Sequence, residues 1–377
     1  MGRCDRQVKA YRAMAGGLKL RPRLVPEPLW WVSLANLADM DPRVLELWLD
    51  EGESPPDVQA LWRSLERSTE CEICGSRAQE LDEVWEYEEL DGGAVARLVG
   101  FRSLCSKCHL ATHLGLAQIR RRFEEAFFWI RAVNGLSRTE AARLVDLAAE
   151  VWGCLNSIPR SRWSVELPAL GESEVRPRLE RLMTSMVRSE RFRPARGWVW
   201  TPENPKVWAP NVQSALSEYP GPLSIVNEAR EAGLKVLRQE LSHAVSLLRR
   251  PSKLDGTPTV VGKWIVFMST REALKLFRRV AEAIGSGSVP ALRAKLSWKR
   301  EDSKAVMVYT PNFLDPRGVA EVARWLASLG VAGRMVYKPD VFTLAGIYRS
   351  HPSLRPHIYE FEPAKVNVEG GALEAWL

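Results

Sequence analysis

Two Cys-x-x-Cys pairs, separated by residues 75–104, constrain the fold of this chain more than any other feature. They are Cys71 with Cys74 and Cys105 with Cys108. Two such pairs can bring four thiolates to one tetrahedral ion, and sulfur ligands suit zinc better than a hard cation. The separation exceeds the commonest ribbon spacing, and an inserted hairpin from about residue 80 to 102 would absorb it. The sequence therefore predicts a zinc site, with reduced core cysteines that hold no metal as the alternative.

Length and composition bound the rest of the prediction. A chain of 377 residues is long enough for two or three cores, and it contains no run of about 18 apolar residues. The N-terminus lacks the apolar stretch of a signal peptide. Cys4 and Cys154 stand isolated, which fits a reducing compartment rather than a disulfide framework. We therefore expect a soluble cytoplasmic protein without a membrane partner, and the scarcity of Asn and Gln predicts a thermophilic source.

The net charge of +7 and the pI near 9.1 favour a polyanionic partner, with nucleic acid as the first candidate. Fifteen tryptophans outnumber both the phenylalanines and the tyrosines, and several stand beside Lys or Arg, as in Trp298-Lys299-Arg300. Aromatic faces beside cations are the groups that hold single-stranded or looped RNA. The alternative is that the 46 acidic residues neutralise the charge and that most tryptophans lie in the core.

The chain is predicted to have five parts. A basic extended arm and a helical pair occupy residues 1–66, and a zinc-binding unit occupies residues 67–159. A basic linker follows over residues 160–200, then an α+β domain over residues 201–363 and a tail over residues 364–377. The arm and the linker have too little apolar content to become ordered alone, which predicts a large partner or, for the linker, an ordinary interdomain tether.

Periodicity supports a multidomain α+β fold. The zinc-binding unit is expected to hold the hairpin and a helix over residues 110–133. A second helix should begin at Ser137, where Ser137 and Glu140 form a capping box. In the last domain, a helix over residues 228–249 and a capping box at Ser269 and Glu272 accompany several strands in a mainly antiparallel order.

The zinc-binding unit resembles the zinc-bearing HNH endonuclease family over about residues 68–159. The two cysteine pairs carry the resemblance, together with the run Glu83-Val84-Trp85-Glu86-Tyr87 and the histidines His109 and His113. The family implies a ββα finger in which a histidine before this strand activates water and others hold a catalytic divalent ion. Asp82 stands at the position of that histidine, and a carboxylate replaces imidazole poorly as a base near neutral pH. We therefore predict a finger kept for binding, without catalysis. If it is a nuclease, Asp82, His109 and His113 are its site.

The last domain resembles the basophilic-leukaemia-expressed-protein family over about residues 201–363. The run from Tyr337 to Thr343 and the Gly346-Ile347-Tyr348-Arg349 sequence carry this resemblance. The family is similar in fold to the cap-binding translation initiation factor 4E, which implies a curved, mainly antiparallel sheet backed by helices. Function follows only weakly, because one fold serves many activities.

Basic residues in these parts are the candidate RNA contacts. Arg120, Arg121 and Arg122 are a plausible phosphate clamp or, alternatively, a solvated helix turn paired with neighbouring glutamates. The full predicted set is Arg21, Arg23, Arg120, Arg121, Arg122, Arg160, Arg162, Trp298, Lys299, Arg300, Lys338 and Arg349.

The overall plan resembles the archaeal zinc-finger ribosome hibernation factors. The resemblance implies a translation inhibitor that binds rRNA and ribosomal subunits, with contacts to ribosomal proteins, and sterically occludes functional sites. Zinc is the expected cofactor, and no small-molecule cofactor is expected. Two alternatives stay open: a metal-dependent HNH-type nuclease, and a stress adaptor that binds proteins through its tryptophans.

Overall fold

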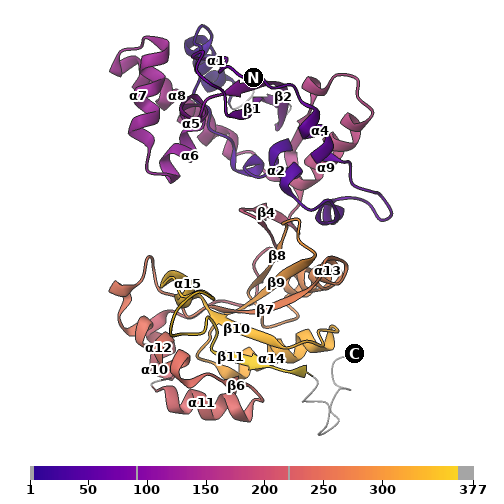
Figure 1. The fold of residues 1–377 in the computed structure, drawn as a ribbon, viewed down its shortest axis with the longest axis vertical. Coiled ribbons are helices and arrows are strands. Elements are labelled where there is room, and N and C mark those ends of the chain that lie inside the picture. Colours follow the sequence, from indigo (N-terminus) through magenta and orange to yellow (C-terminus); the bar gives the residue numbers. More distant parts are fainter. Residues whose placement is uncertain (1–3, 91, 220, 364–377) are drawn as a thin grey trace. The chain divides into compact units, whose positions relative to one another are not determined.

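A computed structural model describes residues 4–90, 92–219 and 221–363 of the chain (Figure 1). It divides into two compact units, which we call the first unit (residues 1–189 and 194–196) and the second unit (residues 190–193 and 197–377). Both units mix helices with strands, so the predicted α+β class is confirmed. The predicted tail over residues 364–377 lies outside the described residues.

The first unit contains a three-stranded sheet in the order β1-β2-β3. Strands β1 (Glu80–Leu90) and β2 (Gly93–Leu104) form the antiparallel hairpin that the sequence predicted between the cysteine pairs. A bulge interrupts their register between Val84 and Trp85. Strand β3 (Trp163–Glu166) joins β2 in parallel.

Helices of 4 to 19 residues make up most of the rest of the regular structure described in the first unit. They are α1 (Asp5–Ala15), α2 (Leu34–Asp39), α3 (Pro42–Leu45), α4 (Val58–Ser64), α5 (Ser106–Thr112), α6 (Leu114–Ile119), α7 (Phe123–Asn134), α8 (Arg138–Asn156) and α9 (Val175–Arg188). The helix predicted over residues 110–133 is broken into α5, α6 and α7, because the backbone turns at His113 and Arg121 adopts a positive φ of 56° after α6. The capping box of Ser137 and Glu140 at the start of α8 is confirmed.

The N-terminal arm packs into the first unit, which corrects the view of an arm without a core. Leu20, Leu34 and Leu37 are fully buried in it. Helix α1 contacts α8, and this packing pairs Cys4 with Cys154 in a disulfide, at a Cα–Cα distance of 5.6 Å. The expectation that these two cysteines stay unpaired was therefore wrong, because residues far apart in sequence meet where the two helices cross.

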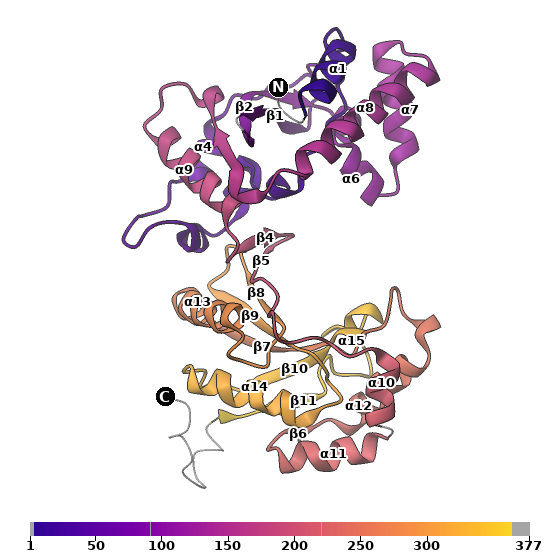
Figure 2. The same ribbon diagram turned by 180° about the vertical axis from the view of Figure 1, so that it is seen from behind.

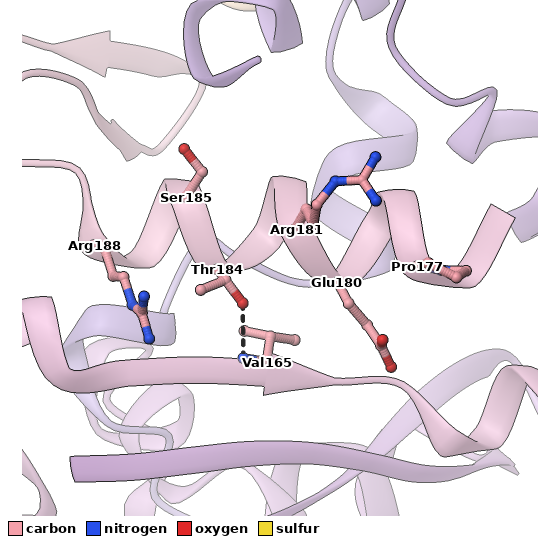
Figure 3. Close-up of a pocket in the computed structure, with 7 residues that line it drawn as sticks. All are labelled: Val165, Pro177, Glu180, Arg181, Thr184, Ser185 and Arg188. Atoms are coloured by element: carbon pink, nitrogen blue, oxygen red, sulfur yellow. Dashed lines mark hydrogen bonds between the residues drawn. The ribbon is translucent and has the colours of Figure 1, made fainter. Parts of the chain in front are cut away.

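The predicted basic linker is also structured over most of its length. Its β3 strand lies at the edge of the sheet, and α9 covers that edge with polar side chains. The backbone N–H of Val165 donates to the Thr184 hydroxyl at 3.0 Å, and Arg188 Nε donates to the Trp163 carbonyl at 2.6 Å. Figure 3 shows Glu180, Thr184 and Arg188 pointing from α9 toward β3, along a pocket that these side chains line. Side chains of α9 thus satisfy backbone groups that an edge strand would otherwise expose.

An eight-stranded sheet has the order β4-β5-β8-β9-β7-β10-β11-β6, and its strands other than β4 belong to the second unit. Its strands are β4 (Arg193–Ala195), β5 (Trp198–Trp200), β6 (Lys235–Val236), β7 (Gly262–Ser269), β8 (Arg293–Ser297), β9 (Ser303–Thr310), β10 (Met335–Pro339) and β11 (Tyr359–Phe361). In the spatial order of the sheet, every pairing between neighbouring strands from β5 at one side to β6 at the other is antiparallel. This sheet confirms the predicted antiparallel order.

Helices α13 (Thr270–Ser286) and α14 (Pro316–Ser328) pack on one face of this sheet (Figure 2). The indole of Trp264 is fully buried beneath them and donates to the Val319 carbonyl at 2.9 Å. Because side chains alternate along a strand, the neighbours Lys263, Ile265 and Phe267 face the opposite side. We call that opposite side the open face.

The remaining helices are α10 (Val212–Glu218), α11 (Pro222–Glu231), α12 (Arg238–Arg249) and α15 (Asp340–Leu344). The single helix predicted over residues 228–249 is instead α11, β6 and α12. Gly233, with φ at 82°, turns the chain between them. The capping box of Ser269 and Glu272 is confirmed. Within the described ranges, no helix combines the length and apolarity needed to cross a membrane.

Candidate functional site

The four cysteines of the two pairs meet in one cluster. Cys71 and Cys74 flank a tight turn before β1, where Gly75 adopts a φ of 73° and donates its N–H to the Cys71 carbonyl. Cys105 is the N-cap of α5, and its sulfur accepts from the Cys108 N–H at 3.4 Å. The four sulfurs lie within 4.8 Å of one another. This cluster can hold a metal ion.

The surroundings of the cluster favour the thiolate form at Cys74 more than at Cys108. Burial raises the pKa of Cys74, but hydrogen bonds from Ser76 and the neighbouring cysteines outweigh it and lower that pKa to about 6. Burial raises the pKa of Cys108 well above its usual range, although Trp129 Nε1 donates to its sulfur at 3.2 Å. An ion would therefore displace a proton from Cys108 when it binds.

A second cluster lies between the hairpin and α5. It joins Asp82 of β1 to His109 and His113, whose ligating atoms lie within 4.8 Å of one another. His113 Nε2 is 2.8 Å from Asp82 Oδ1, and His109 Nε2 is 3.9 Å from the same oxygen. Glu80 Oε2 accepts from His109 Nδ1 at 2.8 Å. The structure thus brings together the three residues that the sequence proposed for a nuclease site.

Two arginines share the Asp82 carboxylate with His113. Arg102 Nη2 lies 2.8 Å from Asp82 Oδ2, and Arg23 Nη2 lies 3.4 Å from Asp82 Oδ1. Burial raises the pKa of Asp82, but the His113 hydrogen bond and the charge of Arg23 outweigh it and hold that pKa far below its usual range. Burial lowers the pKa of His113 to about 4, despite the opposing effect of Asp82. Asp82 is therefore a permanent anion here and a weak base.

A third group of side chains lies on the open face of the second unit. Its members come from four strands and alternate aromatic rings with cations, and we call them the aromatic–cation cluster: Trp198, Trp200, Lys263, Arg293, Lys295 and Tyr309. The strand register sets Trp200 opposite Lys295 and Tyr309 opposite both Lys263 and Arg293.

Short ring contacts hold this cluster together. Lys295 Nζ lies 4.3 Å from the ring centroid of Trp198 and 4.8 Å from that of Trp200. The Arg293 guanidinium lies 4.9 Å from the Trp200 ring, and the rings of Trp200 and Tyr309 are 5.6 Å apart. Such contacts preorganise cations and π-faces side by side.

Burial also changes the acidity of the lysines on this face. It lowers the pKa of Lys295 to about 8, and the charge of Lys263 adds to that effect. Lys338 has its pKa lowered to about 8 for the same two reasons. Lys263 forms an ion pair with Asp340, so one carboxylate lies beside the cations of the aromatic–cation cluster.

The predicted RNA contacts divide into exposed and enclosed residues. The exposed ones are Arg21, Arg120, Arg121, Arg122, Arg162, Lys299, Arg300 and Arg349. Arg122 pairs with Glu125 at 2.6 Å, as the alternative interpretation of this triplet proposed. The enclosed ones are Arg23, Arg160, Trp298 and Lys338.

The enclosed residues make internal contacts. Arg160 Nε donates to the Val187 carbonyl at 3.1 Å, and Lys338 Nζ donates to the Ile347 carbonyl at 2.7 Å while lying 4.1 Å from the ring centroid of Tyr348. Trp298 is 6% exposed and belongs to the core. The burial of these residues could not be predicted from the aromatic or basic residues that neighbour them in the sequence.

Sequence reasoning missed most of the aromatic–cation cluster. The signal was present in the alternation of Trp198-Val199-Trp200 and Arg293-Ala294-Lys295, where aromatic or basic residues recur at every second position. Alternation of this kind places both residues on one face of a strand. The pairing of β5 with β8 was needed to bring the two segments together.

The fold and these sites describe a mixed α+β protein with a cysteine cluster in one unit and a large antiparallel sheet in the other. Comparison with known families matches residues 227–346 to the family described as basophilic leukemia-expressed protein Bles03. This match confirms the predicted resemblance for that region. It covers β7 through β10 and α15, including four members of the aromatic–cation cluster, whereas Trp198 and Trp200 lie outside it.

Proposed function

We propose that this chain binds RNA, that its target is ribosomal RNA, and that it acts as a hibernation-type inhibitor of translation. The observation that carries the proposal is the aromatic–cation cluster on the open face of the eight-stranded sheet. Exposed bases stack on aromatic rings, while neighbouring Lys and Arg contact the phosphates of the same strand. Trp198, Trp200, Arg293 and Lys295 are partly exposed and offer both kinds of group within one small area, whereas Lys263 and Tyr309 are buried.

The aromatic–cation cluster carries more positive than negative charge. Arg293, Lys295 and Lys263 contribute cations, and Asp340 is the carboxylate paired with one of them. Burial is the main cause that lowers the pKa of Lys295, and repulsion from the charges of Lys263 and Arg293 adds to it. A phosphate on this face would relieve that repulsion, which supports a polyanionic ligand.

We further propose that the target lies on ribosomal subunits, where the protein would block functional sites sterically and contact ribosomal proteins. Exposed arginines of the first unit, such as Arg120 and Arg121, would add phosphate contacts. The fold of the second unit is proposed to be similar to that of initiation factor 4E, and β1, β2 and α5 are proposed to form an HNH-like ββα finger. No catalytic step is needed for this activity.

Zinc is the ion that we propose for the four-cysteine cluster. A tetrahedral ion with Zn–S bonds of about 2.3 Å separates its sulfurs by about 3.8 Å. The Cys74 and Cys105 sulfurs are 3.7 Å apart. Zinc bound by Cys71, Cys74, Cys105 and Cys108 would fix the hairpin against α5 and would have a structural role.

Binding of the purified chain to fluorescein-labelled rRNA fragments tests RNA binding directly. We expect the affinity to fall with salt, and the Lys295→Ala and Arg293→Ala variants to bind more weakly than the native chain. Loss of a single phosphate contact should reduce the slope of log K against log salt by about 0.7 for single strands. Equal affinity of native and variant chains would contradict a role for the aromatic–cation cluster.

A metal-dependent nuclease is the second candidate function, because Asp82, His109 and His113 meet next to the hairpin and α5. It predicts cleavage of RNA or DNA with Mg²⁺ or Mn²⁺ and loss of cleavage in His113→Ala. The weak basicity of Asp82 argues against it. Intact substrate after prolonged incubation with either ion would eliminate this candidate.

A further inference from the structure

We propose that Arg23 is a built-in substitute for a metal ion: its guanidinium occupies the Asp82–His109–His113 cluster and keeps a divalent cation out while the N-terminal arm is docked. The cluster would then be a metal site that opens only when the arm moves away. This inference concerns metal occupancy in the first unit, and it depends neither on RNA binding nor on cleavage.

The ligand atoms are arranged for a cation. Asp82 Oδ1 and His113 Nε2 are 2.8 Å apart, close to the separation of two neighbouring ligands on an ion with bonds of about 2.1 Å. His109 turns its Nε2 toward the same oxygen. Two imidazoles and a carboxylate can hold divalent transition-metal ions such as Mn²⁺, Co²⁺ or Zn²⁺.

Glu80 provides a second, independent indication of a metal site. Its carboxylate lies 2.8 Å from His109 Nδ1, on the side of the ring away from Asp82. Metal-binding histidines commonly donate their other ring N–H to a carboxylate in this way, which fixes the tautomer and presents the remaining nitrogen to the ion. His109 is therefore oriented with Nε2 available to the centre of the cluster.

Arg23 fills the position that such an ion would use. Its Nη2 lies 3.4 Å from Asp82 Oδ1 and 3.4 Å from His113 Nε2. A divalent ion bound between these two atoms would lie within a few ångströms of the guanidinium, where two positive charges repel strongly in a partly buried site. The guanidinium and a metal ion therefore exclude each other.

Several contacts hold the arm in this place. The Arg23 N–H donates to the Thr112 carbonyl at 2.7 Å, and its guanidinium also donates to the Glu83 carbonyl. Upstream, the Leu20 N–H and carbonyl both bond to the side-chain amide of Asn134. The Cys4–Cys154 disulfide also ties the arm to α8. Arg23 is thus positioned by the arm as a whole, and not by the salt bridge alone.

Mn²⁺ binding by the full chain tests this inference. The probe is Mn²⁺ itself, measured by electron paramagnetic resonance on chains that carry one equivalent of zinc, which fills the cysteine cluster without occupying the Asp82–His109–His113 cluster. The variants are Arg23→Ala and Arg23→Gln, of which the second keeps a polar side chain of similar reach. Arg21→Ala is the matched control, because the Arg21 guanidinium donates to the backbone carbonyls of Leu18 and Gly16 within the arm.

We expect both Arg23 variants to bind one Mn²⁺ at least about tenfold more tightly than the native and Arg21→Ala chains. Adding His113→Ala should abolish that gain. Equal Mn²⁺ affinity of the native and Arg23 variant chains, whether tight or absent, would overturn the proposal. Zinc content and circular dichroism show whether each variant is folded. If Arg23→Ala fails to fold, the Mn²⁺ affinity of Arg23→Gln decides between the two outcomes.

Discussion

The ammonium group of Lys295 lies 4.3 Å from the ring centroid of Trp198, on a strand that pairs with the strand of that tryptophan. The aromatic rings desolvate the lysine, and its pKa falls to about 8. Most lysines titrate near pH 10.4. The charge of this surface therefore changes in a pH range where an unperturbed lysine stays protonated, which gives the proposed RNA site a measurable signature.

RNA affinity should decline between pH 7 and pH 9. In this range, Lys295 loses its proton because burial lowers its pKa to about 8. The neutral amine no longer attracts phosphate, so we expect a loss of roughly fivefold. Titration of fluorescence anisotropy at fixed ionic strength measures this effect.

A Lys295→Arg variant should show a flatter pH profile, because a guanidinium stays protonated throughout this range. Lys299→Arg, at an exposed lysine outside the aromatic–cation cluster, is the matched control and should keep the native profile. A native profile in Lys295→Arg would show that Lys295 does not contact RNA.

Trp200→Ala should weaken binding of single-stranded RNA by about 1–3 kcal/mol, which is the usual contribution of one stacked base. The variant also removes the ring that lies 4.9 Å from the Arg293 guanidinium. Trp208→Ala is the control, because Trp208 is 76% exposed and lies outside the cluster. Comparable losses in both variants, measured by equilibrium titration, would argue against a specific role for Trp200.

Arg121→Gly should stabilise the first unit while it weakens RNA binding. Arg121 has a φ of 56°, a left-handed conformation that costs a non-glycine residue about 1 kcal/mol. We expect the midpoint of thermal unfolding to rise by a few degrees. Arg121→Ala keeps the strained backbone and removes only the guanidinium, so it should weaken RNA binding without the gain in stability. Unchanged RNA binding in both variants would exclude Arg121 from the interface.

Removal of the proposed zinc ion should destabilise the first unit. Cys108→Ser replaces a fully buried ligand, so we expect one zinc less per chain by mass spectrometry and a lower unfolding temperature. The Cys4→Ser/Cys154→Ser double variant should lose the disulfide and keep its zinc. Equal zinc content in native and Cys108→Ser chains would contradict a four-cysteine site.

Local sequence signals predicted much of the fold. The capping boxes at Ser137 and Ser269 and the hairpin between the cysteine pairs are present, because caps and alternating strands depend on nearby residues. The errors fell where backbone conformation or long-range packing decides the outcome. Arg121 ends a helix with a positive φ that its residue type does not favour. The disulfide of Cys4 and Cys154 depends on the packing of α1 against α8.

The candidate sites show the same division. The spacing of the cysteines was enough to predict their cluster, since the two cysteines of each pair lie within one turn of the chain. The triad of Asp82, His109 and His113 followed from the family resemblance, whereas the position of Arg23 among them did not, because the arm reaches the site from 59 residues away along the chain. The aromatic–cation cluster requires the strand order of the sheet, which no local pattern specifies.

Sedimentation of stationary-phase lysate through sucrose gradients tests the central claim most directly. The protein would be followed across subunit and monosome fractions, with and without ribonuclease, at two salt concentrations. We predict co-migration with ribosomal subunits or monosomes that weakens as salt rises and disappears when the rRNA is degraded. A protein that remains at the top of the gradient under all conditions would contradict the ribosome-binding account.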